Sequence, residues 1–181
     1  MMAALMSMGM MADDFKWLDY IHVAEPVNIR NIDRIYLYPV DASKVEWPDK
    51  TDNKYPALEQ SLKAFPDIIA KTLKKKVRGV NVIIVNSIED AQMDDKALAL
   101  SLRFDELDMG ELSARIWVGA GAGAQRITLA GVCYDKDKNE VFDFHHRRLG
   151  IIGRSYKKDL QIELSNYAND IAKILNELRK K

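Results

Sequence analysis

Two long stretches of the chain carry apolar residues at every third or fourth position, which is the spacing of a buried helical stripe. The first stretch predicts a helix from Tyr55 to Lys76, and its stripe consists of Leu58, Leu62, Phe65, Ile69 and Leu73. The second predicts a helix from Tyr156 to Leu178, preceded by Ser155, a residue type that caps helix N-termini. Pro66 lies inside the first pattern, so we expect it to kink that helix or divide it in two.

Other stretches have the alternation or the apolar runs that are typical of strands. We expect strands at Ile32–Pro39, Val80–Val85, Leu98–Phe104, Gln125–Tyr134 and Glu140–Arg148, and a further extended segment at Ala114–Val118. The polar segment DKDKN predicts a hairpin turn between the last two strands. Val80–Val85 is almost wholly apolar, which favours a strand covered on both faces or central in its sheet. The segment DELDMGEL, which begins at Asp105, predicts a turn or loop.

The order of these elements predicts an α/β (α+β) fold, in which two long helices pack on a single mixed, largely antiparallel sheet of about five to six strands. We expect residues 32–181 to form one domain, because no repeat or low-complexity linker divides them. Residues 13–31 show no clear period and are interpreted as a linker or edge segment.

The first twelve residues, MMAALMSMGMMA, are apolar and uncharged. They match the apolar core of a secretory signal but lack its basic start. Three interpretations stay open for residues 1–12: a complete but atypical signal, the remnant of a signal that starts upstream, and a frayed N-terminus. A signal predicts export to the bacterial periplasm or envelope, and a frayed terminus leaves the cytoplasm as the alternative. The segment is shorter than the about 20 residues that cross a bilayer, and we expect no transmembrane span.

Composition and charge narrow the classes of function. Of the 181 residues, 48% are hydrophobic and 30% are charged, which is typical of a globular domain. The 27 basic and 27 acidic residues balance, and this argues against a protein that coats nucleic acid. The single cysteine, Cys133, excludes an intrachain disulfide, and we expect it to be a buried strand residue.

The run GAGAGA from Gly119 to Ala124 fits part of a dinucleotide-binding fingerprint. That fingerprint requires a helix after the glycines, whereas the strand-like QRITLAGVCY follows here. The run is therefore interpreted as a tight connection or a close backbone approach, and we expect no cofactor. We also expect no metal at His145 and His146, since neighbouring strand residues point to opposite faces.

Basic residues gather near the end of the last predicted strand, where the chain from His145 to Lys158 contains no acidic residue. One interpretation is a solvated surface of mixed sign. The other is an interaction rim that binds an anionic phospholipid surface, a cell-wall polymer or an acidic protein. The candidate rim consists of His145, His146, Arg147, Arg148, Arg154, Lys157 and Lys158.

A family resemblance is carried by the segments WVGAGAGAQRITLAGVCYDKDKNEVFDF and IDRIYLYPVD, together with the long C-terminal helix. Through them the chain resembles domain-of-unknown-function family 4410. The resemblance covers roughly Ile32 to Leu178 and implies a bacterial envelope protein. Many members are lipoproteins, but this chain has no cysteine near its start, so a lipid anchor is not supported. The resemblance brings no catalytic residue with it.

These observations predict a non-catalytic, exported envelope protein with an assembly or scaffold role, which binds either an envelope protein or an anionic envelope component. The alternative is a periplasmic small-ligand or lipid carrier with a pocket between sheet and helices. A third hypothesis is a hydrolase, which would require a deep cleft that joins His145 or His146 to a carboxylate.

Overall fold

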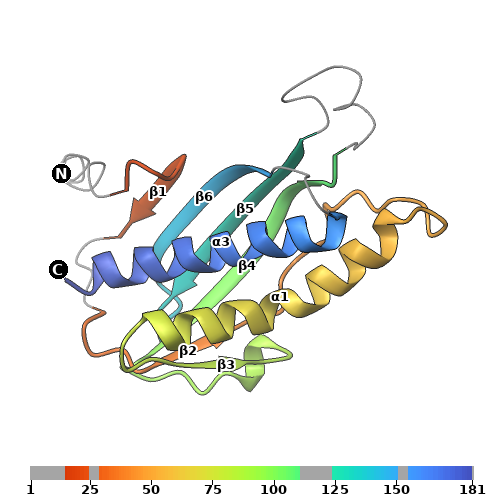
Figure 1. Ribbon diagram of the computed structural model, residues 1–181. Coiled ribbons are helices and arrows are strands. Elements are labelled where there is room, and N and C mark those ends of the chain that lie inside the picture. Colours follow the sequence, from red (N-terminus) through yellow and green to blue (C-terminus); the bar gives the residue numbers. More distant parts are fainter. Residues whose placement is uncertain (1–14, 25–28, 111–123, 151–154, 181) are drawn as a thin grey trace, which may run out of the picture.

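A computed structural model describes residues 15–24, 29–110, 124–150 and 155–180, and it has an α+β fold with one mixed sheet. The six strands lie in the order β1-β6-β5-β4-β2-β3. Helices α1 and α3 cover one face of this sheet (Figure 1). The strands span Tyr20–Val23 (β1), Arg34–Leu37 (β2), Asn81–Ile84 (β3), Ala97–Asp108 (β4), Gln125–Tyr134 (β5) and Glu140–Gly150 (β6). The predicted fold class is therefore confirmed.

The bounds of the two helices agree to within one residue with those that the apolar stripes predict. Helix α1 spans Lys54–Lys76 and α3 spans Tyr156–Leu178. The side chain of Ser155 caps α3 by accepting a hydrogen bond from the backbone N–H of Lys158 at 3.3 Å. Pro66 lies inside α1 and does not divide it.

The predicted hairpin is present, and it forms the centre of the antiparallel part of the sheet. Strand β5 pairs with β6 on one side and with β4 on the other, both antiparallel. Strand β2 is parallel to both β3 and β4, so the sheet is mixed. Strand β1 lies within the segment interpreted as a linker or edge, and it pairs with β6 at the edge of the sheet.

Strand β4 is longer than predicted, because Asp105 to Asp108 continue the strand where a loop is expected. The register with β5 shifts between Phe104 and Glu106, which leaves Asp105 as the extra residue of a β-bulge. The bulge allows Phe104 and Leu107 both to be buried although they are three residues apart. Because polar residues lie between Phe104 and Leu107, the alternation of apolar and polar positions does not predict that the strand continues.

Strand β3 differs from the expectation of a central strand, because it pairs only with β2 and lies at the edge of the sheet. Its apolar side chains divide between two environments. Val82 packs on the main core, and Ile83 packs on a smaller cluster that contains Tyr36 and Tyr38 of the opposite sheet face. Ile84 is exposed, which is consistent with an edge position.

The main core lies between the sheet and the helices. Its fully buried side chains include Phe65 of α1, Phe104 of β4, Phe142 of β6 and Tyr167 of α3. Cys133 is buried with them, as expected for a small apolar strand residue. The expected extended segment at 114–118 and the glycine run at 119–124 lie outside the described residues, apart from Ala124.

Candidate functional site

Four consecutive members of the predicted rim lie on β6, and the alternation of the strand separates them. His146 and Arg148 face helix α3, whereas His145 and Arg147 face the opposite side of the sheet from α1 and α3. As the sequence predicts, the two histidines do not converge on one point.

His146 lies in a packed polar cluster between β6, α3 and the segment before β1. Its Nδ1 is 3.0 Å from Oδ2 of Asp19, and its Nε2 is 3.8 Å from Oδ2 of Asp170. Its ring packs edge-on against Trp17 and Tyr167, and its side chain is 11% exposed. The backbone N–H of Arg147 donates to Asp19 and, with smaller contributions from His146, lowers the pKa of that carboxyl.

Arg148 links β6 to α3 through two carboxylates. Its Nε donates to Glu163 at 3.1 Å and its Nη1 to Asp170 at 2.8 Å. Burial acts to lower the pKa of Arg148, but Glu163 and Asp170 outweigh burial and raise it. Burial also raises the pKa of Asp170, against the opposing effects of Arg148 and His146. These contacts hold α3 in place on the sheet.

On the other sheet face, the basic residues also have acidic neighbours. His145 Nε2 lies 3.8 Å from Oδ2 of Asp105, and Arg147 Nε lies 3.7 Å from Oε2 of Glu106. The bulge in β4 brings both carboxylates to this face. The positive charges of the strand are therefore largely balanced by residues that are distant in sequence.

The remaining rim residues lie elsewhere. Lys157 Nζ donates to Oε1 of Gln60 at 2.8 Å and so joins α3 to α1. Lys158 is exposed on the first turn of α3, and Arg154 lies outside the described residues. The described members thus divide between two faces of β6 and the start of α3, and they do not form one continuous basic surface.

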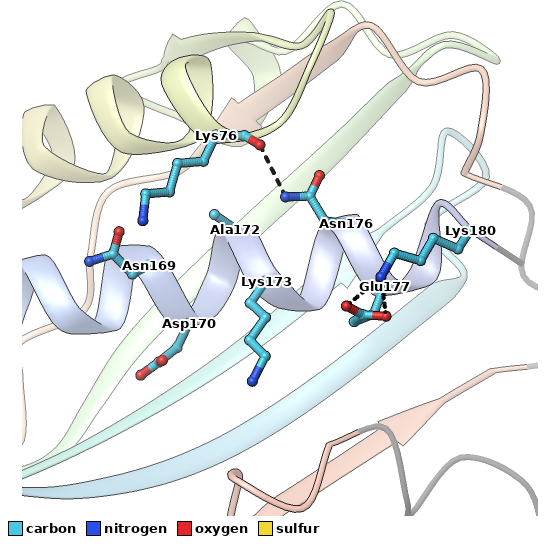
Figure 2. Close-up of a pocket in the computed structure, with 8 residues that line it drawn as sticks. All are labelled: Lys76, Asn169, Asp170, Ala172, Lys173, Asn176, Glu177 and Lys180. Atoms are coloured by element: carbon cyan, nitrogen blue, oxygen red, sulfur yellow. Dashed lines mark hydrogen bonds and ion pairs between the residues drawn. The ribbon is translucent and has the colours of Figure 1, made fainter.

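A surface hollow of about 720 Å³ lies along the second half of α3 (Figure 2). Its lining residues are Lys76, Asn169, Asp170, Ala172, Lys173, Asn176, Glu177 and Lys180. Asn176 donates to the backbone oxygen of Lys76 at 3.0 Å, and Lys180 forms an ion pair with Glu177 at 2.7 Å. Lys173 Nζ lies 4.2 Å from the centre of the Trp17 ring. The sequence does not predict this hollow, because Lys76 at the end of α1 is distant in sequence from α3 and meets it only in the folded chain.

A second hollow, of about 630 Å³, lies before α1 and is lined by Trp47, Pro48, Asp49, Lys50 and Tyr55. Trp47 is 45% exposed, and its ring lies 5.4 Å from that of Tyr55 at an angle of 46°. A smaller adjoining hollow shares Trp47 and Pro48. The only sequence signal for this aromatic surface was a tryptophan and a proline in a polar loop.

The polar cluster brings a histidine to two carboxylates, which is part of what a hydrolase requires, but His146 is packed between rings rather than placed in a deep cleft. Among the described residues, no serine, threonine or cysteine donates a hydrogen bond to a histidine. Burial raises the pKa of the Cys133 thiol well above its usual range. The cluster joins β6, α3 and the segment before β1.

No helix in the described part of the chain is long and apolar enough to cross a bilayer.

Comparison with solved structures gives matches at low sequence identity. One is the PelC dodecamer from Paraburkholderia phytofirmans, with a TM-score of 0.54 and 12% identity, covering 84% of this chain and 96% of that chain. Another is a dodecamer of the same protein with one leucine replaced by methionine, with a TM-score of 0.53 and 12% identity, covering 84% and 98%. At this identity the likeness concerns the fold alone.

No curated protein matches this chain. The sequence profile of the domain-of-unknown-function family DUF4410 matches residues 23–153, which is most of the chain. This match includes the glycine run, the β5–β6 hairpin and β2, and it ends before α3, which the resemblance seen in the sequence also covers. The chain therefore belongs to the DUF4410 family.

Proposed function

We propose that this protein is a non-catalytic, exported envelope protein that acts by binding another component of the envelope. The observation that carries the proposal is the aromatic surface formed by exposed Trp47 and partly buried Tyr55, with Pro48 beside them. Tryptophan and tyrosine supply most of the energy at many protein interfaces, because their rings bury a large area and lose little conformational entropy. A half-exposed tryptophan in a hollow is well placed to anchor a partner.

Charge around this surface supports a protein partner with polar edges. Asp49 and Lys50 lie beside the aromatic rings and carry opposite charges. An interface with an apolar centre and a charged rim is the usual arrangement in protein complexes. The apolar N-terminal twelve residues support placing the partner in the envelope.

In-cell photocrosslinking tests the proposal directly. A photoreactive residue replaces Trp47 in one variant and the exposed Lys71 of α1 in a control variant. We expect the same envelope protein to be captured repeatedly from position 47 and not from position 71, with the chain in the envelope fraction. Capture of nothing at position 47, or recovery of the chain in the cytoplasmic fraction, contradicts the proposal. Lipid that co-purifies in place of a protein supports the carrier alternative.

In a second form of the same proposal, the binding partner is an anionic component of the envelope, and the hollow along α3 is its binding site. Asp170 and Glu177 already pair with Arg148 and Lys180, which leaves Lys76 and Lys173 as the positive charges of its lining. Cosedimentation with phosphatidylglycerol vesicles tests this form. We expect binding that weakens as salt rises and that Lys173→Glu reduces, while Lys63→Glu on the exposed side of α1 serves as a control of equal charge change. Binding that is independent of salt contradicts it.

Self-association is a further form of binding that the proposal includes. The PelC structures of similar fold are dodecamers. Here two four-residue strands, β1 and β3, lie at the edges of the sheet, and Tyr20 and Ile84 on them are exposed. Light scattering coupled to size exclusion measures the outcome. A mass several times 20.6 kDa supports assembly of copies, and a mass of one chain contradicts this form.

A further inference from the structure

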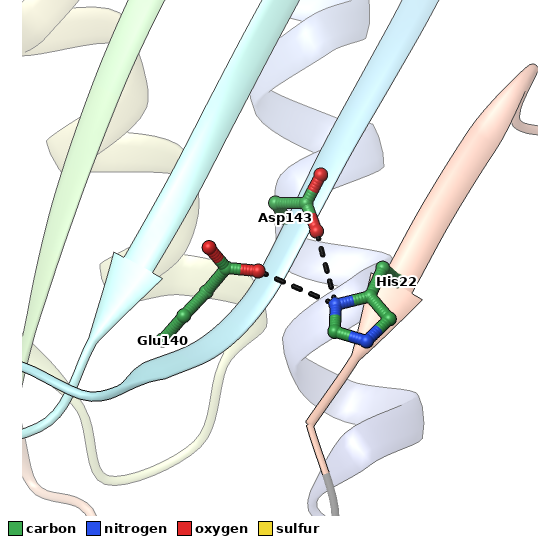
Figure 3. Close-up of side chains that lie close together, drawn as sticks. All are labelled: His22, Glu140 and Asp143. Atoms are coloured by element: carbon green, nitrogen blue, oxygen red, sulfur yellow. Dashed lines mark hydrogen bonds and ion pairs between the residues drawn. The ribbon is translucent and has the colours of Figure 1, made fainter. Parts of the chain in front are cut away.

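The side chains of His22, Glu140 and Asp143 converge at the edge of the sheet (Figure 3). His22 lies on β1, and the two carboxylates lie on β6. The Nδ1 atom of His22 is 3.3 Å from Oε1 of Glu140 and 3.2 Å from Oδ1 of Asp143. We propose that these three side chains bind a divalent transition-metal ion that fastens β1 to β6.

The backbone explains why the three groups share one face. His22 is the direct antiparallel partner of Asp143. In a regular strand, Glu140 and Asp143 would point to opposite faces, because they are three residues apart. The register between β5 and β6 shifts between Cys133 and Tyr134, which leaves Val141 as an extra residue. This bulge turns Glu140 to the face of Asp143, and bulges commonly redirect a side chain at a functional site.

The distances match those between ligands of one ion. Zinc bonds to histidine nitrogen and carboxylate oxygen are about 2.0–2.2 Å long, so two ligands at tetrahedral or octahedral angles lie about 3 Å apart. The two nitrogen–oxygen distances of 3.2 and 3.3 Å are of this size. All three ligand atoms lie within 4.8 Å of one another. Both oxygens approach the same nitrogen, whereas one N–H group serves only one acceptor well.

The charges at this position also favour a cation. Among the ion pairs of the described residues, none joins Glu140 or Asp143 to a lysine or an arginine. A bound divalent ion would neutralise the two carboxylates, and it would remove their mutual repulsion.

The donor set indicates the class of ion. One imidazole nitrogen and two carboxylate oxygens suit Zn²⁺ and neighbouring first-row ions better than Ca²⁺, which prefers six or more oxygens. Three protein ligands leave at least one position for water. The side chain of His22 is 56% exposed, so we expect exchangeable binding rather than a buried structural site. This inference stands independently of the proposed function.

Isothermal titration calorimetry of Zn²⁺ into the chelator-treated protein tests the site by measuring the affinity and the number of ions bound. We expect one Zn²⁺ per chain, with affinity reduced by at least about tenfold in His22→Ala and in Asp143→Asn. His145→Ala is the matched control, because His145 is also exposed and lies 3.8 Å from an aspartate. Thermal unfolding without metal checks that each variant folds, and Asp143→Asn keeps the shape of the side chain.

Hydrogen exchange separates the fastening role from adventitious binding. We expect Zn²⁺ to slow exchange of the β1 amides in the unsubstituted chain and in His145→Ala, but not in His22→Ala. If His145→Ala loses as much Zn²⁺ affinity as His22→Ala does, the proposal is contradicted. Unchanged affinity in His22→Ala, stronger binding of Ca²⁺ than of Zn²⁺, and absence of any slowing in β1 also contradict it.

Discussion

The hydroxyl of Tyr167 donates a hydrogen bond to the backbone oxygen of Ile127 at 2.6 Å, which joins α3 directly to β5. The same hydroxyl lies 3.1 Å from the backbone oxygen of His146 on β6. Tyr167 is fully buried, and burial raises the pKa of its hydroxyl above the usual range, so it stays a donor at all ordinary pH. One side chain thus holds a helix to two neighbouring strands.

Loss of this hydroxyl should destabilise the fold without creating a large cavity. We expect Tyr167→Phe to lower the free energy of unfolding by about 1 kcal/mol, because the buried backbone oxygen of Ile127 loses the hydrogen bond from this hydroxyl. Urea unfolding measures the change. Tyr20→Phe is the control, since Tyr20 is 51% exposed. An equal loss in both variants contradicts the assignment.

Gly131 should tolerate no side chain, because β5 passes close to two buried residues there. An added Cβ would lie 2.6 Å from Cζ of Phe144 and 2.8 Å from Cδ2 of Leu102. We expect Gly131→Ala to lower the free energy of unfolding by about 1–3 kcal/mol through overpacking.

Thermal unfolding of Gly131→Ala should show a lower midpoint, and Phe144→Leu in the same chain should recover part of the loss. If the two substitutions have additive effects, the steric explanation is wrong.

The thiol of Cys133 should be unreactive toward thiol reagents in the folded chain. It is buried, and its pKa is raised by burial, so little thiolate forms near neutral pH. We expect no reaction with Ellman's reagent in native buffer and one equivalent of released thiolate in denaturant. Rapid reaction of the native chain contradicts the buried position.

Asp105 should make the fold sensitive to acid. Hydrogen bonds from Arg103 and Lys44 lower the pKa of its carboxyl from 3.8 to about 2. Since the folded pKa is the lower one, the stabilisation is full above the unfolded pKa near 3.8 and is lost as the pH falls toward 2.

Urea unfolding at two pH values tests this dependence. We expect the unsubstituted chain to exceed Asp105→Asn in stability at pH 5 and this difference to shrink strongly at pH 2.5. The same difference at both pH values contradicts the role of the Asp105 charge.

The sequence predicted those elements whose side-chain period is regular. The stripe from Leu160 to Leu178 placed α3 correctly because that helix buries one face along its whole length. The β5–β6 hairpin was equally clear, since its arms alternate and a polar turn joins them. The parts that periodicity missed are irregular: β1 has only four residues, and the bulge at Asp105 interrupts the alternation of β4.

The sites were less predictable than the fold, because they depend on which distant residues become neighbours. The basic rim looked continuous in the sequence, yet strand alternation places His145 and His146 on opposite faces. Its charge is balanced by acidic residues from other elements, such as Glu163 of α3. The grouping of His22 with Glu140 and Asp143 needs both strand register and a bulge, and neither is visible in the sequence.

The position of β1 has a consequence for how the chain matures. Its partner strand is β6, and 118 residues separate His22 from Glu140. Strand β1 therefore cannot take its place in the sheet until β6, which lies more than a hundred positions later in the chain, is available to pair with it. Until this long-range pairing forms, the backbone N–H and C=O groups of β1 have no partner strand and stay accessible to any factor that binds unfolded chains.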